Sequence, residues 1–138
     1  MKKRVKILVV DDEVVIRESL GDWLDDLGHQ VLIADNGVQA LEIIEREKPG
    51  IVISDLVVLG MDGVELLNRA KEISLGISVI IMTAYGSIPS AITAMKEGAY
   101  DYIEKPFFSE KVELLIDKLV EHQRLLECKS FAPSLWNQ

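Results

Sequence analysis

The sequence predicts an α/β protein of the doubly wound type: five βα units forming a parallel sheet of strand order 2-1-3-4-5, with helices on both faces. The first reason is that short apolar runs alternate with longer segments of helical period, which is the pattern of βαβ units. The second is that 138 residues, 49% of them hydrophobic, suffice to cover one sheet on both faces.

The elements follow one another along the whole chain. We expect strands near residues 5–10, 31–34, 51–54, 78–82 and 101–104. The first helix is predicted to end at Gly28 and the second before Pro49, and a third lies around residues 64–73. The fourth helix has Ser87 as its expected N-cap, a proline in its first turn and Gly98 just beyond its end.

The last helix is predicted over residues 109–127, with Ser109 as its cap. One subset of its residues has heptad spacing over barely two heptads: Val112, Ile116, Leu119, Gln123 and Leu126. Packing on the helix's own sheet accounts for most of this subset, and only Leu125-Leu126 suggests a partner or a linker. We therefore divide the chain into a domain of residues 1–127 and a tail or linker start of residues 128–138.

Composition excludes several classes of protein. The net charge of −8 argues against direct nucleic-acid contact by this domain. The single cysteine, Cys128, cannot form an internal disulfide. The apolar runs are far shorter than the roughly 20 residues that cross a bilayer, and no signal-peptide cleavage site follows the basic start. We expect a cytoplasmic protein without membrane contact.

Polar residues stand at the ends of four of the predicted strands. Asp11 and Asp12 follow the first strand, Asp55 the third, Thr83 the fourth and Lys105 the fifth. The carboxyl ends of parallel strands share one edge, and ligands of doubly wound sheets bind there, at the switch point between strands 1 and 3. We therefore expect these five side chains to converge.

That set of groups suits phosphoryl chemistry. Carboxylates gathered in one crevice repel one another unless cations compensate, and Lys105 supplies one positive charge. Oxygen ligands with a phosphate favour Mg²⁺ over Ca²⁺ as the second cation. Asp55 can then act as a nucleophile that forms an acyl phosphate, while the Thr83 hydroxyl can hydrogen-bond a transferring oxygen.

Six short motifs carry a family resemblance. They are Val9-Val10-Asp11-Asp12-Glu13, Ser54-Asp55, Gly60-Met61-Asp62-Gly63, Met82-Thr83-Ala84, Gly98-Ala99-Tyr100-Asp101-Tyr102 and Lys105-Pro106-Phe107. With them, residues 4–127 resemble the flavodoxin-like receiver domains of two-component response regulators, and are most similar to receivers of nitrogen-regulation-type transcription activators.

The resemblance implies a phosphorelay signalling domain rather than a turnover enzyme. Asp55 would accept phosphate from a sensor histidine kinase or a phosphotransfer protein. Asp12 and Asp55 would ligate Mg²⁺ directly, Asp11 through water, and Val57 through its backbone carbonyl.

The resemblance also implies a switch. Thr83 and Ala84 would contact the phosphoryl group and Tyr102 would rotate inward, which changes the surface of the fourth helix, fifth strand and fifth helix. That surface would control an output domain C-terminal to this segment, a partner or a homodimer. The bond before Pro106 would be cis, aiming Lys105 into the site.

The sequence departs from the family pattern at three positions. Leu59 stands where many receivers have proline. Val57 and Tyr85 occupy the positions that tune dephosphorylation in the family, and our hypothesis is that they hinder the attacking water and lengthen the life of the phosphoryl state.

Other functions are compatible with parts of this pattern. A haloacid dehalogenase-like phosphatase needs a second Asp where this chain has Val57. A flavin-binding module needs a glycine- and hydroxyl-rich loop after the first strand, where this chain has acidic residues. The remaining alternative is a phosphorylation-independent interaction domain on the same fold.

Overall fold

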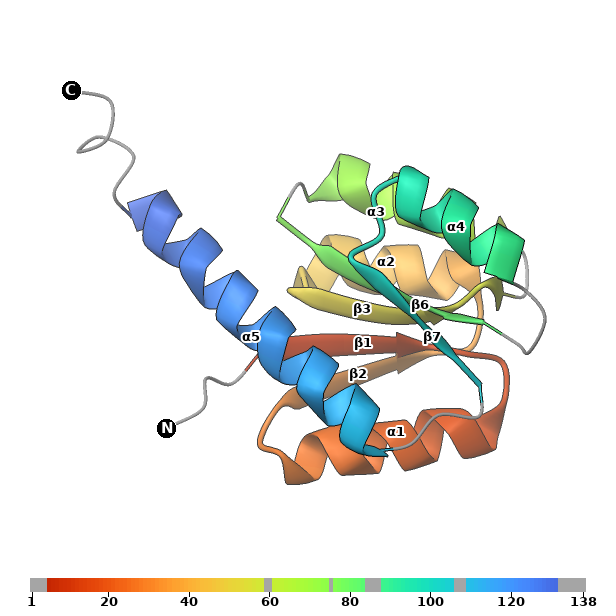
Figure 1. Cartoon of the computed structure of the whole chain (residues 1–138), viewed down its shortest axis with the longest axis horizontal. Helices are drawn as coiled ribbons and strands as arrows, with labels where there is room; N and C mark the ends of the chain where they lie inside the picture. The colour runs from red at the N-terminus through yellow and green to blue at the C-terminus, as the bar shows by residue number, and fades with distance from the viewer. Residues whose placement is uncertain (1–4, 59–60, 75, 84–87, 106–108, 132–138) are drawn as a thin grey trace.

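Five parallel strands form the central sheet (Figure 1). The computed structural model describes residues 5–58, 61–74, 76–83, 88–105 and 109–131. The strands are β1 (Lys6–Val10), β2 (Gln30–Ala34), β3 (Ile51–Asp55), β6 (Ser78–Thr83) and β7 (Asp101–Glu104). Their order is β2-β1-β3-β6-β7, and all neighbours are parallel. The predicted order 2-1-3-4-5 is confirmed, and each strand lies within one residue of its expected ends.

Helices cover both faces of this sheet. They are α1 (Val14–Asp26), α2 (Gly37–Glu47), α3 (Gly63–Ile73), α4 (Ile88–Lys96) and α5 (Ser109–Phe131). Buried side chains of α1 and α5 pack on one face, and those of α2, α3 and α4 pack on the other. In Figure 1, α5 crosses in front of the strands and α1 lies below them, whereas α3 and α4 lie above.

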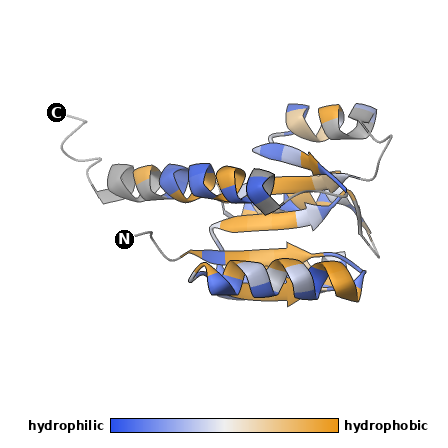
Figure 2. Ribbon diagram, turned by 60° about the horizontal axis from the view of Figure 1, so that its bottom comes forward, coloured by the Kyte–Doolittle hydropathy of each residue, from blue (hydrophilic) through white to orange (hydrophobic). Residues whose placement is uncertain are grey.

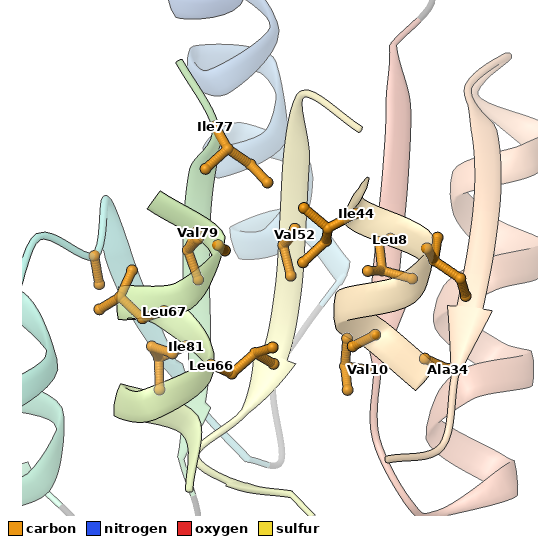
Figure 3. Close-up of a cluster of buried hydrophobic side chains, with 14 of the residues drawn as sticks. Leu8, Val10, Ala34, Ile44, Val52, Leu66, Leu67, Ile77, Val79 and Ile81 are labelled. Atoms are coloured by element: carbon orange, nitrogen blue, oxygen red, sulfur yellow. The ribbon is translucent and has the colours of Figure 1, made fainter. Parts of the chain in front are cut away.

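Each face of the sheet has its own hydrophobic core. Leu8 and Val10 of β1 join the core beneath α2 and α3 (Figure 3), whereas Ile7 and Val9 join the core beneath α1 and α5. Because both faces of the central strands β1, β3 and β6 are buried, these strands are largely hydrophobic. Figure 2 accordingly shows much of the sheet as hydrophobic ribbon. Burial of each such side chain stabilises the fold by about 1.5–3 kcal/mol.

The helix ends follow the sequence signals. Gly28 lies just beyond α1 with φ of +95°, and Gly98 just beyond α4 with φ of +110°, a conformation that glycine adopts without steric cost. Pro89 occupies the first turn of α4, as expected. The predicted cap Ser87 lies outside the described residues.

A short hairpin follows β3 and was not predicted. Its strands, β4 (Val57–Val58) and β5 (Met61–Asp62), pair antiparallel. Two-residue strands are too short to produce a periodic pattern in the sequence. Asp62 then caps α3, because its Oδ1 accepts hydrogen bonds from the amides of Val64 and Glu65.

Helix α5 is longer than predicted. It runs to Phe131 rather than to residue 127, since no glycine or proline interrupts the chain before Pro133, and it begins at Ser109 itself. Its heptad-spaced residues Ile116 and Leu119 are buried in the core, and Gln123 donates to the Gly76 carbonyl and Ser78 Oγ. These heptad positions therefore pack on the helix's own sheet. Among the described residues, no helix combines the length and apolarity needed to cross a membrane.

Replacement of Gly63 by alanine should destabilise the fold. A Cβ at this position would lie 2.7 Å from the Leu56 carbonyl oxygen and 2.9 Å from that of Asp55, both backbone atoms that cannot move without shifting the end of β3. We expect Gly63→Ala to lower the free energy of unfolding in urea by about 1–3 kcal/mol.

The matched control is Gly21→Ala in the middle of α1. There the new Cβ would lie 3.6 Å from Val31 Cγ1, an ordinary contact. Because glycine lowers helix stability relative to alanine, this variant should gain about 0.5–1 kcal/mol. An equal gain for Gly63→Ala would contradict the steric argument.

Candidate functional site

The sheet register brings the polar strand ends together. Val10 of β1 pairs with Ser54 of β3, so Asp11 and Asp55 follow at the same level of adjacent strands. Carboxylate oxygens of Asp11, Asp12 and Asp55 all lie within 4.8 Å of one another. Asp11 is fully buried, Asp12 is exposed, and the side chain of Asp55 is 15% exposed. The site is therefore anchored in the core and open on one side.

Lys105 lies between two of these carboxylates. Its Nζ is 2.7 Å from Asp11 Oδ2 and 2.9 Å from Asp55 Oδ2, and its side chain is 16% exposed. The residue is held by its backbone as well, because its amide donates to the Thr83 carbonyl at 2.7 Å. Burial alone would lower the pKa of Lys105, but the hydrogen bonds and charges of Asp11 and Asp55 outweigh burial and raise it.

The loop between β1 and α1 fixes the orientation of Asp11. Its Oδ1 accepts a hydrogen bond from the Glu13 amide at 2.9 Å, and its carbonyl accepts one from Arg17 Nη1 at 2.8 Å. Glu13 also reaches to 3.8 Å from Lys105 Nζ. Sequence reasoning assigned no role to Arg17; its place one turn into the helix after the acidic loop was the available signal.

The Thr83 hydroxyl is an unusual buried group. Thr83 is fully buried at the end of β6, and among the described residues its Oγ1 has no hydrogen-bond partner. Buried hydroxyls are normally satisfied, and an unpaired one costs about 1–3 kcal/mol. A buried hydroxyl that has no partner among the described residues, at the same edge of the sheet as the carboxylates, suits a site that receives an oxygen-bearing ligand.

These side chains also fit a magnesium ion. Asp11, Asp12 and Asp55 offer only hard oxygen donors, and one carboxylate is exposed to solvent, as suits an ion that keeps several waters. Val57 lies in β4, two residues after Asp55, so its backbone belongs to the same loop.

Tyr102 lies on β7, opposite Ile81 of β6. It is half-buried and packs against the core beneath α2, α3 and α4. The predicted site residues Ala84, Tyr85 and Pro106 lie outside the described residues, as does Leu59.

Comparison with known proteins identifies the family. Residues 7–117 match the response regulator receiver domain. The chain belongs to this family. The receiver is 41% identical over 113 residues to sporulation initiation phosphotransferase F of Bacillus subtilis (strain 168), a match covering 82% of this chain and 91% of that protein. Receivers of this family bind Mg²⁺ in an acidic pocket and act in two-component signalling.

Longer regulators contain similar receivers. The chain is 39% identical to the transcriptional regulatory protein ZraR of Klebsiella oxytoca over 125 residues, or 91% of this chain and 28% of that protein. The crystal structure of the NtrX receiver domain from Brucella abortus superposes with a TM-score of 0.80 at 37% identity, over 83% of this chain and 98% of that one. The receiver thus spans less than a third of ZraR.

Removal of the Lys105 charge should destabilise the receiver in metal-free buffer. In Lys105→Met the buried carboxylate of Asp11 loses its cation, and we expect a loss of about 1–3 kcal/mol in urea unfolding. Because the folded pKa of Lys105 is raised, its stabilisation is complete below the unfolded pKa of about 10.4 and is lost as pH rises through the folded pKa. The difference between wild type and variant should therefore persist from neutral pH to about pH 10.

The control is Lys6→Met, which removes a lysine paired at 3.3 Å with Glu47, where the two side chains are 38% and 31% exposed. Solvent-screened pairs contribute little, so its loss of stability should be smaller than that of Lys105→Met. Equal stability of Lys105→Met and wild type would contradict the assigned role of Lys105.

Proposed function

We propose that this receiver accepts a phosphoryl group on Asp55 from the phosphohistidine of a sensor histidine kinase or phosphotransfer protein, in a Mg²⁺-dependent reaction. The observation that carries the proposal is the Lys105 ammonium held within 2.9 Å of both Asp11 and Asp55, beside Asp12. No observation favours a phosphorylation-independent interaction domain.

The transfer uses the Asp55 carboxylate as nucleophile. A carboxylate oxygen bonds to phosphorus while the phosphorus–nitrogen bond of the donor breaks, and the imidazole leaves with the electron pair. Asp55 is 15% exposed and can be reached from the open side of the cluster. Lys105 neutralises charge on the transferring oxygens, and the Thr83 hydroxyl with the Ala84 backbone binds one of them.

The metal is held by the acidic cluster. Asp12 and Asp55 would hold Mg²⁺ directly, Asp11 would hold it through water, and Val57 would contribute its backbone carbonyl. When bound, the ion supplies two positive charges against the three carboxylates and the phosphoryl oxygens. The chain catalyses only its own phosphorylation and slow dephosphorylation, and we place it in the cytoplasm.

Asp55→Asn should abolish phosphorylation. With acetyl phosphate and Mg²⁺, intact-protein mass spectrometry should show one added phosphoryl group on wild type and none on the variant, because the amide is not a nucleophile. The control Asp62→Asn removes a nearby carboxylate outside the cluster, and asparagine still caps α3. Phosphorylation of Asp55→Asn would reject Asp55 as the acceptor. Loss of phosphorylation in Asp62→Asn as well would show that the effect of Asp55→Asn is not specific to Asp55.

The output surface comprises α4, β7 and α5. Phosphorylation draws Thr83 toward the phosphoryl group and Tyr102 inward, which repacks this surface. It carries exposed apolar side chains: Ile92 at 49%, Met95 at 37% and Leu114 at 66% exposure. A similar receiver, that of NtrC4, is a dimer when activated by beryllofluoride (TM-score 0.80, 34% identity). We propose that a second copy of this chain or a C-terminal output domain binds this surface.

Activation should therefore change the oligomeric state or the exposure of this surface. Size-exclusion chromatography with beryllofluoride and Mg²⁺ should show a dimer that Leu114→Glu weakens by about tenfold, an energy of about 1.4 kcal/mol. Val15→Glu on α1, where the valine is 71% exposed, is the matched control. An activated protein that stays monomeric would exclude the homodimer.

The phosphoryl state should be long-lived. We propose that Val57 and Tyr85 hinder the attacking water, so Val57→Asn and Tyr85→Ala should each speed phosphoryl loss from Asp55 by about tenfold, or about 1.4 kcal/mol of activation free energy. The control Val38→Asn makes the same valine-to-asparagine change at an exposed position of α2 and should leave the rate of phosphoryl loss unchanged. Unchanged or slower hydrolysis in the two variants would refute the hypothesis.

A further inference from the structure

Met61 of the short hairpin lies directly over Gly37, the first residue of α2. A Cβ built on Gly37 would meet the Met61 side chain, with Sδ at 2.8 Å and Cε at 3.0 Å and Cγ nearer still. Gly37 is buried within the helix and lacks a positive φ, so its backbone does not require glycine. The missing side chain therefore serves to make room for Met61.

The helix end beneath Met61 is rigidly built. Asn36 caps α2 by accepting a hydrogen bond from the Gln39 amide at 2.8 Å. Gln39 Oε1 in turn accepts from the amide of Asp35, the residue before the cap, at 3.0 Å. Gly37 thus lies between a hydrogen-bonded N-cap and the first turn of α2, and the Met61 side chain packs against it.

Both sides of this contact lead to the acidic cluster. On one side, Ala34 at the end of β2 accepts a hydrogen bond from the Asp11 amide at 3.2 Å, three residues before Gly37. On the other, Met61 pairs with Val58, and its neighbour Asp62 pairs with Val57. The Met61 contact therefore ties the loop after Asp55 to the segment that supports Asp11.

The two side chains of β5 differ in their surroundings. Asp62 is exposed and caps α3, whereas Met61 is half-buried and packs on the core beneath α2 and α3. Displacement of Met61 would tilt β5 and, through the pairing, β4 with Val57.

We propose that Met61 seated on Gly37 is a positioning device that holds the Val57 carbonyl for Mg²⁺ binding. Neither residue touches the metal; both act through the β4–β5 pairing. This inference rests on the proposed function, because it concerns the ligand set given there. Residues that orient metal ligands typically change metal affinity by about 10–100-fold when mutated.

The test is a Mg²⁺ titration of the unphosphorylated full chain, followed by amide shifts in NMR spectra. Gly37→Ala should weaken Mg²⁺ binding by about tenfold, since the new methyl displaces Met61. Met61→Ala should weaken it similarly. The double variant should bind Mg²⁺ no more weakly than Met61→Ala alone, because the methyl then has nothing to displace. Gly21→Ala, whose Cβ has room, is the control and should match wild type.

Several outcomes would overturn the inference. A Met61→Ala variant that binds Mg²⁺ with wild-type affinity would overturn it, and this result is decisive even if Gly37→Ala does not fold. Additive losses of Mg²⁺ affinity in the double variant would also overturn it. Asp12→Asn separates this inference from the proposed function. Loss of Mg²⁺ binding in Asp12→Asn with no change in Met61→Ala refutes only the positioning role, whereas unchanged binding in Asp12→Asn refutes the metal site itself.

Discussion

The ion-pair contact of Lys105 with Asp11 and Asp55 is the interaction on which the site depends. The three groups come from the ends of β7, β1 and β3, which are up to 94 residues apart in sequence. Burial of the Asp11 carboxylate at the switch point costs free energy unless a cation lies nearby. Lys105 supplies that cation and offsets the repulsion between the gathered carboxylates. The other residues of the site are arranged around this contact between one ammonium group and two carboxylates.

The hydrophobic sheet makes this arrangement rigid. Residues of β1 and β3 that precede the carboxylates are buried on both faces, and their register fixes the level at which the two strands end. A slip of one residue would exchange the two cores, so the register is strongly specified. The acidic cluster can therefore be partly solvated while the strands that carry it are buried and held in register.

The two side chains proposed to respond to phosphorylation are less completely hydrogen-bonded or buried than the residues of this sheet. Thr83 has a buried hydroxyl without a partner among the described residues, and Tyr102 is only half-buried on β7. A new phosphoryl group would give the hydroxyl its missing partner, which is the kind of differential contact that shifts a two-state equilibrium. Phosphorylation at the strand ends can thereby change the packing of the surface formed by α4, β7 and α5.

Sequence alone was enough to predict the strand limits and the grouping of Asp11, Asp12, Asp55, Thr83 and Lys105 at one edge, because period and strand-end polarity are local signals. The strand order followed from the doubly wound fold type that these signals indicate. Three-dimensional packing alone revealed the β4–β5 hairpin, the contact of Met61 with Gly37, and the hydrogen bond from Arg17 to the Asp11 carbonyl. These features depend on which distant atoms share a given space, and no local pattern in a chain encodes that.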